Sequence, residues 1–367
     1  MKQHLILIIL LLMGAQFNSF SACSAPLKTE NLVVVTLDGM RWQEIFRGID
    51  LKNVLNKKFT RFPLKLMNQY QTTTEKSSRE RLMPFFWNTL VKNGQLYGNR
   101  SLHNYVDVSN PYRFSYPGYN ELFTGFPDPK VDSNDNIPNK NDNVFEFINH
   151  LNAFQNKVAV FATWEAIPFI LNRDRSGLNI NADRDEFTFG GPKADELNRI
   201  QKTIPRPLGV RPDEITFAGA KAFLELKHPR VLYISLGETD EAAHMSKYDS
   251  YLNSAHKADQ LIADLWNSLQ SMKEYQGRTT LIIATDHGRG GWGKPNWTDH
   301  GDDDKGPILE SSQIWLGFMG PDTPASGEVS GGTHLYQKQM AQTIAHFLGL
   351  DYQSTHPVAP AMEPVFK

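Results

Sequence analysis

Acidic and imidazole side chains follow directly after three separate aliphatic stretches of this chain. The stretches and their polar followers are residues 32–37 with Asp38, residues 230–236 with Asp240 and His244, and residues 281–284 with Asp286 and His287. Carboxylate oxygens and imidazole nitrogens are ligands of zinc, and manganese or iron can also accept this mixture. Each motif alone also has a purely structural explanation, such as a polar turn. Because three coincide, the sequence indicates a metal site assembled from distant segments.

The spacing within two of these motifs supports this interpretation. Asp240 and His244 are four residues apart, so a helix would place both on one side. Asp286 and His287 precede Gly288, and glycine lets backbone and substrate approach closely. A further histidine, His300, lies in a polar loop rich in glycine and aspartate. Together these residues are enough for two metal ions with open positions, which suit phosphoryl transfer to or from a hydroxyl.

Ser115 is the candidate nucleophile. It precedes a short segment, Tyr119 to Thr124, whose composition is helix-like. A hydroxyl at a helix amino terminus lies near free N–H groups and the positive end of the helix dipole, which favours an anion. The structural alternative is that Ser115 is only a helix cap.

The aliphatic stretches predict the elements that must position these residues. Such runs are typical of strands buried on both faces in a parallel sheet, where ligands bind at the carboxyl ends. We therefore expect an α/β fold with a mainly parallel central sheet. The predicted strands are residues 32–37, 157–163, 230–236, 281–284 and 313–319, and the predicted helices are residues 84–92, 144–151, 251–272 and 337–349.

Length and composition are those of a globular enzyme. The chain has 367 residues, of which 40% are hydrophobic and 21% charged, and its net charge is −2. Without a long run of one sign, the sequence predicts no nucleic-acid-binding face. We expect one catalytic domain over residues 27–355, with residues 172–212 as a cap insertion and residues 356–367 as a C-terminal tail.

The amino terminus has the pattern of an export signal. A charged start is followed by a short aliphatic core and then by small and polar residues, which predicts a signal peptide over residues 1–22. Cys23 is the only cysteine, so the chain forms no internal disulfide. Its context, Phe20-Ser-Ala-Cys23, resembles a bacterial lipobox, with a simple secreted chain as the alternative. We expect an exported protein, periplasmic or at the cell surface, with Cys23 as the point of a lipid anchor.

Five motifs, taken in order, resemble those of the alkaline phosphatase superfamily, and most closely its nucleotide pyrophosphatase/phosphodiesterase branch. They are Val-Thr-Leu-Asp38-Gly, Ser115-Tyr-Pro-Gly-Tyr-Asn-Glu-Leu-Phe-Thr-Gly, Glu-Thr-Asp240-Glu-Ala-Ala-His244, Thr-Asp286-His287-Gly and Asp-His300-Gly. The resemblance implies a three-layer α/β/α sandwich. It also implies two divalent ions, with zinc expected, one held by Asp38, Ser115, Asp286 and His287 and the other by Asp240, His244 and His300.

The resemblance also suggests substrate contacts. Asn136 resembles in spacing an asparagine that contacts a phosphate oxygen in the family, and Asn134 and Asn139 are neighbouring alternatives. Arg41 and Arg113 are further candidates by charge and position. His334 competes with His300 for the last ligand position, and we prefer His300 because the family's last histidine precedes the strand predicted at residues 313–319.

The implied activity is hydrolysis of small phosphate mono- or diesters through a phosphoserine at Ser115. The branch usually carries threonine followed by Phe-Pro-Asn-His, so the substrate pocket beside Ser115-Tyr-Pro-Gly-Tyr differs here. Sulfatases of the superfamily have arginine where Tyr119 stands, which argues against arylsulfatase chemistry. The alternatives are a phosphonate or sulfate ester hydrolase with the same site, and a non-catalytic surface lipoprotein that binds a glycan or an anion.

Overall fold

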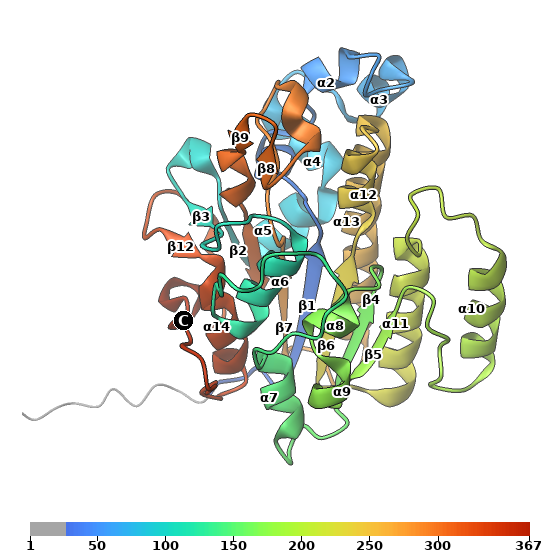
Figure 1. Cartoon of the computed structure of the whole chain (residues 1–367), viewed down its shortest axis with the longest axis vertical. Helices are drawn as coiled ribbons and strands as arrows, with labels where there is room; N and C mark the ends of the chain where they lie inside the picture. The colour runs from blue at the N-terminus through green and yellow to red at the C-terminus, as the bar shows by residue number, and fades with distance from the viewer. Residues whose placement is uncertain (1–26) are drawn as a thin grey trace, which may run out of the picture.

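A central sheet with helices on both faces organises the computed structural model, which describes residues 27–367 (Figure 1). The predicted signal peptide and Cys23 lie outside these residues. The sheet has eight strands in the order β11-β2-β10-β7-β1-β6-β4-β5. Their bounds are β1 Asn31–Leu37, β2 Gly94–Tyr97, β4 Val158–Ala162, β5 Asn179–Ala182, β6 Val231–Leu236, β7 Thr279–Ala284, β10 Leu316–Met319 and β11 Gly327–Glu328.

The sheet is mainly parallel, as predicted. β1 pairs in parallel with β6 on one side and with β7 on the other, and Val34 faces Tyr233 and Ile282 across these pairs. β10 is the exception, because it runs antiparallel to both β7 and β2. The five predicted strands are all present, whereas β2, β5 and β11 carry no strong aliphatic run and were not predicted.

Alternating side chains of the central strands fill two cores, one on each face of the sheet. Val33 and Val35 pack in one core, and Leu32 and Val34 pack in the other. The first core includes side chains of α1 Trp42–Arg47, α4 Glu75–Leu82, α11 Asp213–Lys227 and α13 Tyr248–Ser271. The second includes side chains of α6 Ser115–Thr124, α7 Val144–His150, α8 Ile167–Ile170 and α14 Met340–Phe347. The expected three-layer sandwich is therefore confirmed.

The helical segments follow the predicted pattern with local differences. The long helix α13 is present, and residues 337–339 form a 3₁₀ turn before α14. The helix predicted at residues 84–92 is a π-helical turn, Phe86–Leu90, followed by α5 Val91–Asn93. Within residues 27–367, no helix combines the length and apolarity needed to cross a bilayer. The remaining α-helices and short strands are α2 Leu51–Leu55, α3 Pro63–Tyr70, α9 Arg173–Ser176, α10 Pro192–Thr203, α12 Glu238–His244, β3 Val106–Asp107, β8 Asp302–Asp303, β9 Gly306–Pro307 and β12 Leu335–Tyr336.

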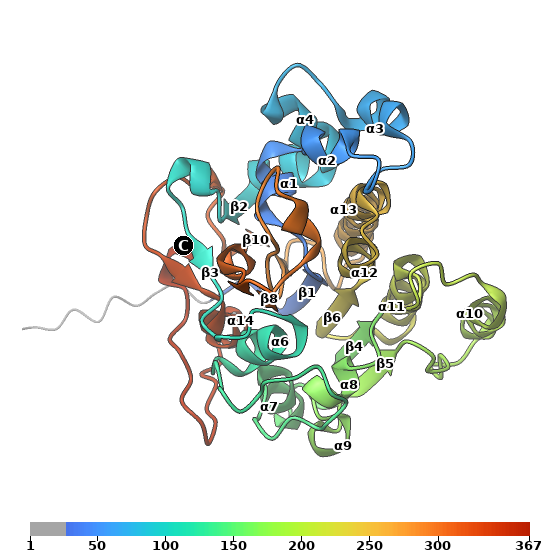
Figure 2. The ribbon, with the colours of Figure 1, turned by 45° about the horizontal axis from the view of Figure 1, so that its top comes forward.

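Residues 172–212, expected as a cap, are divided between the sheet and its flank. β5 pairs with β4 as the last strand of the sheet, and α10 packs beside α11 at the edge of the molecule (Figures 1 and 2). The cap is therefore not confirmed. Residues 356–367, expected as a tail, pack onto the domain: Met362 and Val365 are fully buried, and the Tyr97 hydroxyl donates to the Pro364 carbonyl oxygen at 3.1 Å.

Candidate active site

The carboxyl ends of β1, β6 and β7 bring the predicted polar residues together. Asp38 follows β1 directly, and Asp286 follows β7 after one intervening residue. After β6 the chain enters α12, which carries Asp240 and His244 one turn apart. As their spacing predicts, these two side chains meet, with 2.9 Å between Asp240 Oδ2 and His244 Nε2.

A first cluster consists of Asp38, Asp286 and His287, whose ligand atoms lie within 4.8 Å of one another. His287 Nε2 is 3.6 Å from Asp38 Oδ1 and 3.4 Å from Asp286 Oδ2. The other two carboxylate oxygens are occupied, because Tyr119 donates to Asp38 Oδ2 and the Gly39 N–H donates to Asp286 Oδ1, both at 3.0 Å. The oxygens facing His287 have no hydrogen-bond partner among the described residues. Each carboxylate therefore keeps one buried oxygen available.

The proton position on His287 follows from its second ring nitrogen. Nδ1 lies 2.8 Å from the carbonyl oxygen of Gly288, which can only accept. Nδ1 therefore carries a proton, and in the neutral ring Nε2 is the nitrogen whose lone pair faces the cluster. A backbone carbonyl in this position is the usual device that fixes the tautomer of a metal-binding histidine.

A second cluster shares His287 with the first. It consists of Asp240, His287 and His300, again with ligand atoms within 4.8 Å of one another. His244 lies beside it, because its Nε2 is 3.1 Å from His300 Nε2. Burial and the neighbouring His287 lower the pKa of His300 well below its ordinary value, which keeps the ring neutral. Four of the predicted ligands thus surround this position.

Ser115 is the first residue of α6 and points into the first cluster. The preceding Phe114 occupies the cap position and makes no side-chain cap bond, so Ser115 is not the cap. Its Oγ lies 3.2 Å from His287 Nε2, and the residue is 5% exposed. The helix can approach so closely because Gly118 lacks a side chain: a Cβ there would lie 2.5 Å from the Asp286 carbonyl oxygen.

Crowded carboxylates dominate the electrostatics of the site. Burial, together with neighbouring Asp286 and Asp240, raises the pKa of Asp38 well above its ordinary value. Burial likewise raises the pKa of Asp286, against the opposing effect of His287. At Asp240, burial also acts upward, but Arg289 and His244 outweigh it, and the pKa is well below the ordinary range. The site therefore gathers more carboxyl groups than its own cationic side chains can pair.

Two residues of the site were not predicted. Arg289 is fully buried and forms an ion pair with Asp240 Oδ1, and it also donates to the Thr298 carbonyl oxygen. Tyr119, noted from the sequence only for the arginine it replaces, supports Asp38 through its hydroxyl. In the sequence, the only indication that Arg289 belongs to the site is its position two residues after His287. Whether its side chain reaches Asp240 depends on β6 and β7 lying on either side of β1.

The structure places Arg41, a candidate phosphate contact in the sequence, away from the cavity at the site. Arg41 is fully buried, forms an ion pair with Glu44 and donates to the Gly290 carbonyl oxygen at 3.0 Å. It does not line the cavity at the site. The pair with Glu44 raises the pKa of Arg41 despite the opposing effect of burial. Its role is to hold the loop after β7 against α1.

The other substrate candidates differ in where the structure places them. Asn136 is exposed and does not line the cavity, whereas Asn134 does. Asn134 Oδ1 accepts from the Tyr116 N–H at 2.9 Å, and Asn139 instead donates to Asn120 Oδ1 at 3.0 Å. Arg113 is likewise outside the cavity lining, and its backbone adopts a left-handed conformation with φ 56°.

His334 is not at the site. Its Nε2 lies 2.6 Å from Asp107 Oδ2, and its ring stacks on Tyr336 with 4.5 Å between centroids. It therefore belongs to the small β3–β12 sheet region, whereas His300 lies in the second cluster. The placement agrees with the preference for His300 over His334.

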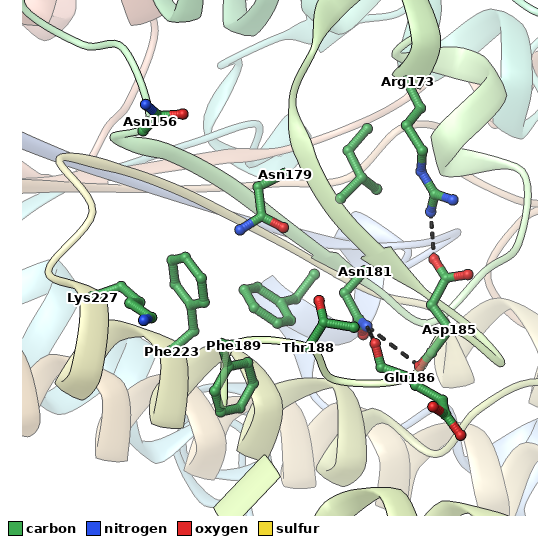
Figure 3. Close-up of a pocket in the computed structure, with 12 residues that line it drawn as sticks. Asn156, Arg173, Asn179, Asn181, Asp185, Glu186, Thr188, Phe189, Phe223 and Lys227 are labelled. Atoms are coloured by element: carbon green, nitrogen blue, oxygen red, sulfur yellow. Dashed lines mark hydrogen bonds and ion pairs between the residues drawn. The ribbon is translucent and has the colours of Figure 1, made fainter. Parts of the chain in front are cut away.

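A cavity of about 290 Å³ opens over the clusters. Its lining residues are Asp38, Ser115, Asn134, Trp164, Val210, Gly237, Asp240, Glu241 and His244. A larger cavity, about 600 Å³, lies at the β5 edge and is lined by Phe189, Phe223, Asn181 and the Arg173–Asp185 ion pair, among others (Figure 3). It contains none of the clustered carboxylates and histidines, so the smaller cavity is the candidate active site.

Divalent cations fit this donor set. The free oxygens of Asp38 and Asp286 and the lone pair of His287 Nε2 converge at one position. Buried unpartnered carboxylate oxygens are costly unless a cation satisfies them. The mixture of carboxylate and imidazole suits a first-row metal ion.

Known structures share this fold. Alkaline phosphatase PafA superimposes with a TM-score of 0.60 at 12% identity, over 94% of this chain and all of that chain. Murine ectonucleotide pyrophosphatase/phosphodiesterase 5 gives a TM-score of 0.55 at 11% identity, over 91% of this chain and 97% of its own. The lipoteichoic acid synthase LtaP from Listeria monocytogenes gives a TM-score of 0.56 at 12% identity, over 89% of this chain and 73% of its own. At these identities the likeness establishes the fold alone.

Sequence comparison identifies the family. A search of curated proteins gave no match. The family model described as type I phosphodiesterase / nucleotide pyrophosphatase matches residues 64–295, more than half of the chain, including Ser115, Asp240, His244, Asp286 and His287. With the alkaline phosphatase fold and an Asp/His cluster at the carboxyl edge of its sheet, the chain belongs to the type I phosphodiesterase / nucleotide pyrophosphatase family and is a hydrolase of phosphoester bonds.

Proposed function

We propose that this protein hydrolyses phosphodiesters at a two-metal site, with Ser115 as the nucleophile. The observation that carries the proposal is the position of Ser115 Oγ, 3.2 Å from His287 Nε2, where the two ligand clusters meet. In the proposal, Asp38, Ser115, Asp286 and His287 hold one ion, and Asp240, His244 and His300 hold the other. Zinc is the expected metal, with manganese or iron as alternatives.

The chain's own residues orient the attack. Ser115 projects from the first turn of α6, where the helix dipole favours the charge of a serine alkoxide or a bound phosphoryl group. The Gly288 carbonyl keeps the proton on His287 Nδ1, so the lone pair of Nε2 faces Ser115 Oγ and would be available to the ion that both residues hold. When bound, the metal ions would supply electrostatic stabilisation of the serine alkoxide and of the departing oxygen. Ser115 Oγ forms a bond to phosphorus, the ester oxygen leaves with a proton, and water later releases the serine.

Asn134 is the proposed contact for a phosphoryl oxygen. Its Oδ1 already accepts the Tyr116 N–H, so its Nδ2 is the group left to donate into the cavity. The hydrogen bond to Tyr116 also ties Asn134 to the first turn of α6, which carries Ser115. This position replaces Asn136 in the predicted role.

The charge of the lining favours a diester over a monoester. Among residues 27–367, no lysine or arginine lines the cavity, and Glu241 adds a carboxylate to its wall. Arg289, the buried cation nearby, is committed to Asp240. A phosphodiester carries a single negative charge, whereas a monoester dianion would bring a second charge without a side-chain cation to meet it. Trp164 and Val210 offer apolar surface to the group esterified to phosphate.

Export is part of the proposal and rests on the amino-terminal sequence. Residues 1–22 have the composition of a signal peptide, and Cys23 follows in a lipobox-like context. The substrate is accordingly proposed to be a small phosphodiester outside the cytoplasm.

Metal analysis and a substrate panel test the function. We expect about two divalent ions per chain, and hydrolysis of bis(4-nitrophenyl) phosphate that a chelator abolishes and the added metal restores. Ser115→Ala should lose turnover while still binding metal through its Asp and His ligands. The control is Ser133→Ala, a half-buried loop serine whose hydroxyl forms hydrogen bonds only with Asp135, and this variant should keep full activity.

The same panel decides among the alternatives. 4-Nitrophenyl phosphate, 4-nitrophenyl sulfate and an aryl phosphonate ester are compared with the diester at equal concentration. Faster turnover of the sulfate or the phosphonate would replace the proposed substrate class. Metal binding without hydrolysis of any ester would instead support a binding lipoprotein, and full activity of Ser115→Ala would refute the nucleophile.

A further inference from the structure

Residues 51–65 form an exposed surface in which apolar and basic side chains alternate, here called the basic-apolar patch. Four of the ten large apolar side chains exposed in the described residues lie within this short stretch: Leu51 (40%), Leu55 (60%), Phe62 (55%) and Leu64 (75%). Because such side chains are usually scattered singly over a surface, this concentration requires an explanation.

The positive charge of the patch is not balanced. Residues 51–70 contain five lysines and arginines and no acidic residue, although the whole chain has a net charge of −2. All five are exposed, and none of them forms an ion pair within residues 27–367. They are Lys52, Lys57, Lys58, Arg61 and Lys65. An anionic partner would therefore find cations that the protein itself does not neutralise.

The exposed apolar side chains are not an incompletely packed core. Val54 of α2 and Leu66 and Tyr70 of α3 are already buried against the domain. Leu55 and Leu64 lie on other sides of the same helices. The segment is also firmly held, because the Tyr248 N–H donates to the Phe59 carbonyl oxygen at 2.8 Å and the Phe59 ring packs edge-on against Trp297. The patch is thus a preformed feature of a rigid surface.

The patch lies at the same end of the molecule as the candidate active site. α2 and α3 lie side by side at the top in both views, the end toward which β6 leads into α12 (Figures 1 and 2). Asp50, which caps α2, accepts a hydrogen bond from the Gly293 N–H, and Gly293 belongs to the loop between His287 and His300. A surface bound to the patch would therefore contact the end of the domain that also carries the loop between His287 and His300.

We propose that the basic-apolar patch docks the protein onto an anionic phospholipid membrane. Interfacial binding needs apolar side chains that enter the boundary between headgroups and acyl chains, with cations around them at the level of the phosphates. The exposed side chains of Phe62 and Leu64 lie between Arg61 and Lys65 in the chain. This segment of five residues therefore supplies both the apolar side chains and the flanking cations. Docking holds the catalytic end of the domain close to the bilayer.

Vesicle co-sedimentation tests the proposal, using the purified Cys23→Ser protein so that no acyl chain can be attached. We expect binding to vesicles of phosphatidylcholine with phosphatidylglycerol, little binding to phosphatidylcholine alone, and weakening by high salt. The triple variant Lys57→Gln, Lys58→Gln, Lys65→Gln should lower the partition coefficient by roughly fivefold per lysine. The double variant Phe62→Ser, Leu64→Ser should lose the binding that remains at high salt.

Matched control variants show whether binding depends on the patch itself or on exposed lysine and leucine side chains anywhere on the surface. Lys157→Gln, Lys227→Gln, Lys273→Gln removes three exposed lysines elsewhere, and Leu226→Ser removes a half-exposed leucine on α11; both should bind as the parent does. All variants should hydrolyse a soluble aryl diester at the parental rate, since the patch does not line the cavity.

Three results would overturn the proposal. These are no binding to the anionic vesicles, equal binding of the patch variants and the parent, and binding to duplex DNA or to an acidic protein without binding to vesicles. None of them bears on the proposed hydrolysis, which is measured on a soluble ester.

Discussion

The ion pair between Arg289 and Asp240 allows a quantitative test of metal binding at the site. Arg289 is fully buried in an ion pair with Asp240, and its removal in Arg289→Met takes the guanidinium from Asp240 and leaves it the contact with His244 in the metal-free protein. Breaking one side of a buried ion pair costs about 3–5 kcal/mol. For a domain of this size, that loss corresponds to a decrease in melting temperature of about 4–7 °C.

Bound metal should reduce this loss. A divalent ion beside Asp240 supplies the positive charge that Arg289 otherwise provides, and ligand binding stabilises the folded state by mass action. We therefore expect the decrease in melting temperature to be at least halved when the metal is saturating. The assay is differential scanning calorimetry of the parent and of Arg289→Met, each in chelator and in excess zinc or manganese.

Arg41→Met is the matched control for this experiment. Arg41 is also fully buried in an ion pair, with Glu44, but neither residue belongs to the two clusters. Its loss should destabilise the protein equally with and without metal. If Arg289→Met behaves in the same way, then no cation takes the place of the guanidinium, and the assignment of Asp240 as a metal ligand fails.

Three further predictions address the supports of the site and of the fold. Tyr119→Phe removes the hydrogen bond to Asp38 Oδ2 and should weaken metal binding by about 10–100-fold in calorimetric titration; unchanged affinity would refute this support. Gly118→Ala places a Cβ 2.5 Å from the Asp286 carbonyl oxygen, so the shift of α6 should cost about 1–3 kcal/mol and slow turnover, measured by urea unfolding and steady-state kinetics. An unaltered kcat would show that Ser115 tolerates the shift. Burial raises the pKa of Asp259 to about 7 despite the N–H groups of Phe85 and Phe86. The protonated form is therefore favoured on folding, and its stabilisation is full below about pH 4 and lost as the pH rises through about 7; Asp259→Asn should flatten this part of the pH profile of unfolding free energy, and an unchanged profile would contradict it.

Local sequence determined the ligand motifs and the strands that carry them. A buried aliphatic run followed by aspartate places that aspartate at the carboxyl edge of a parallel sheet, because both the strand and its exit are encoded in adjacent residues. The spacing of Asp240 and His244 is likewise a local property of one helical turn. For these reasons Asp38, Asp240, His244 and Asp286 could be placed from local sequence, whereas Ser115 and His300 were assigned from the resemblance to the family.

Long-range packing determines the contacts of the residues that follow no such local pattern. Arg41 and Arg289 are both arginines close to a ligand motif, yet one pairs with Glu44 and the other with Asp240, and only the strand order distinguishes them. Asn134 and Asn136 lie two residues apart in a loop without periodicity, so their directions depend on contacts with α6.

The distinction between local sequence and long-range packing also applies to the edge strand β5 and to the basic-apolar patch. β5 lies in the segment expected as an insertion, because an edge strand of four residues has little aliphatic signal in the sequence. Its pairing with β4 is what defines it as a strand. The lysines of residues 51–65 are evident in the sequence. The exposure of Leu55, Phe62 and Leu64 is not evident in the sequence, because apolar residues are normally expected in the interior. Only the folded domain shows which apolar side chains its core leaves exposed.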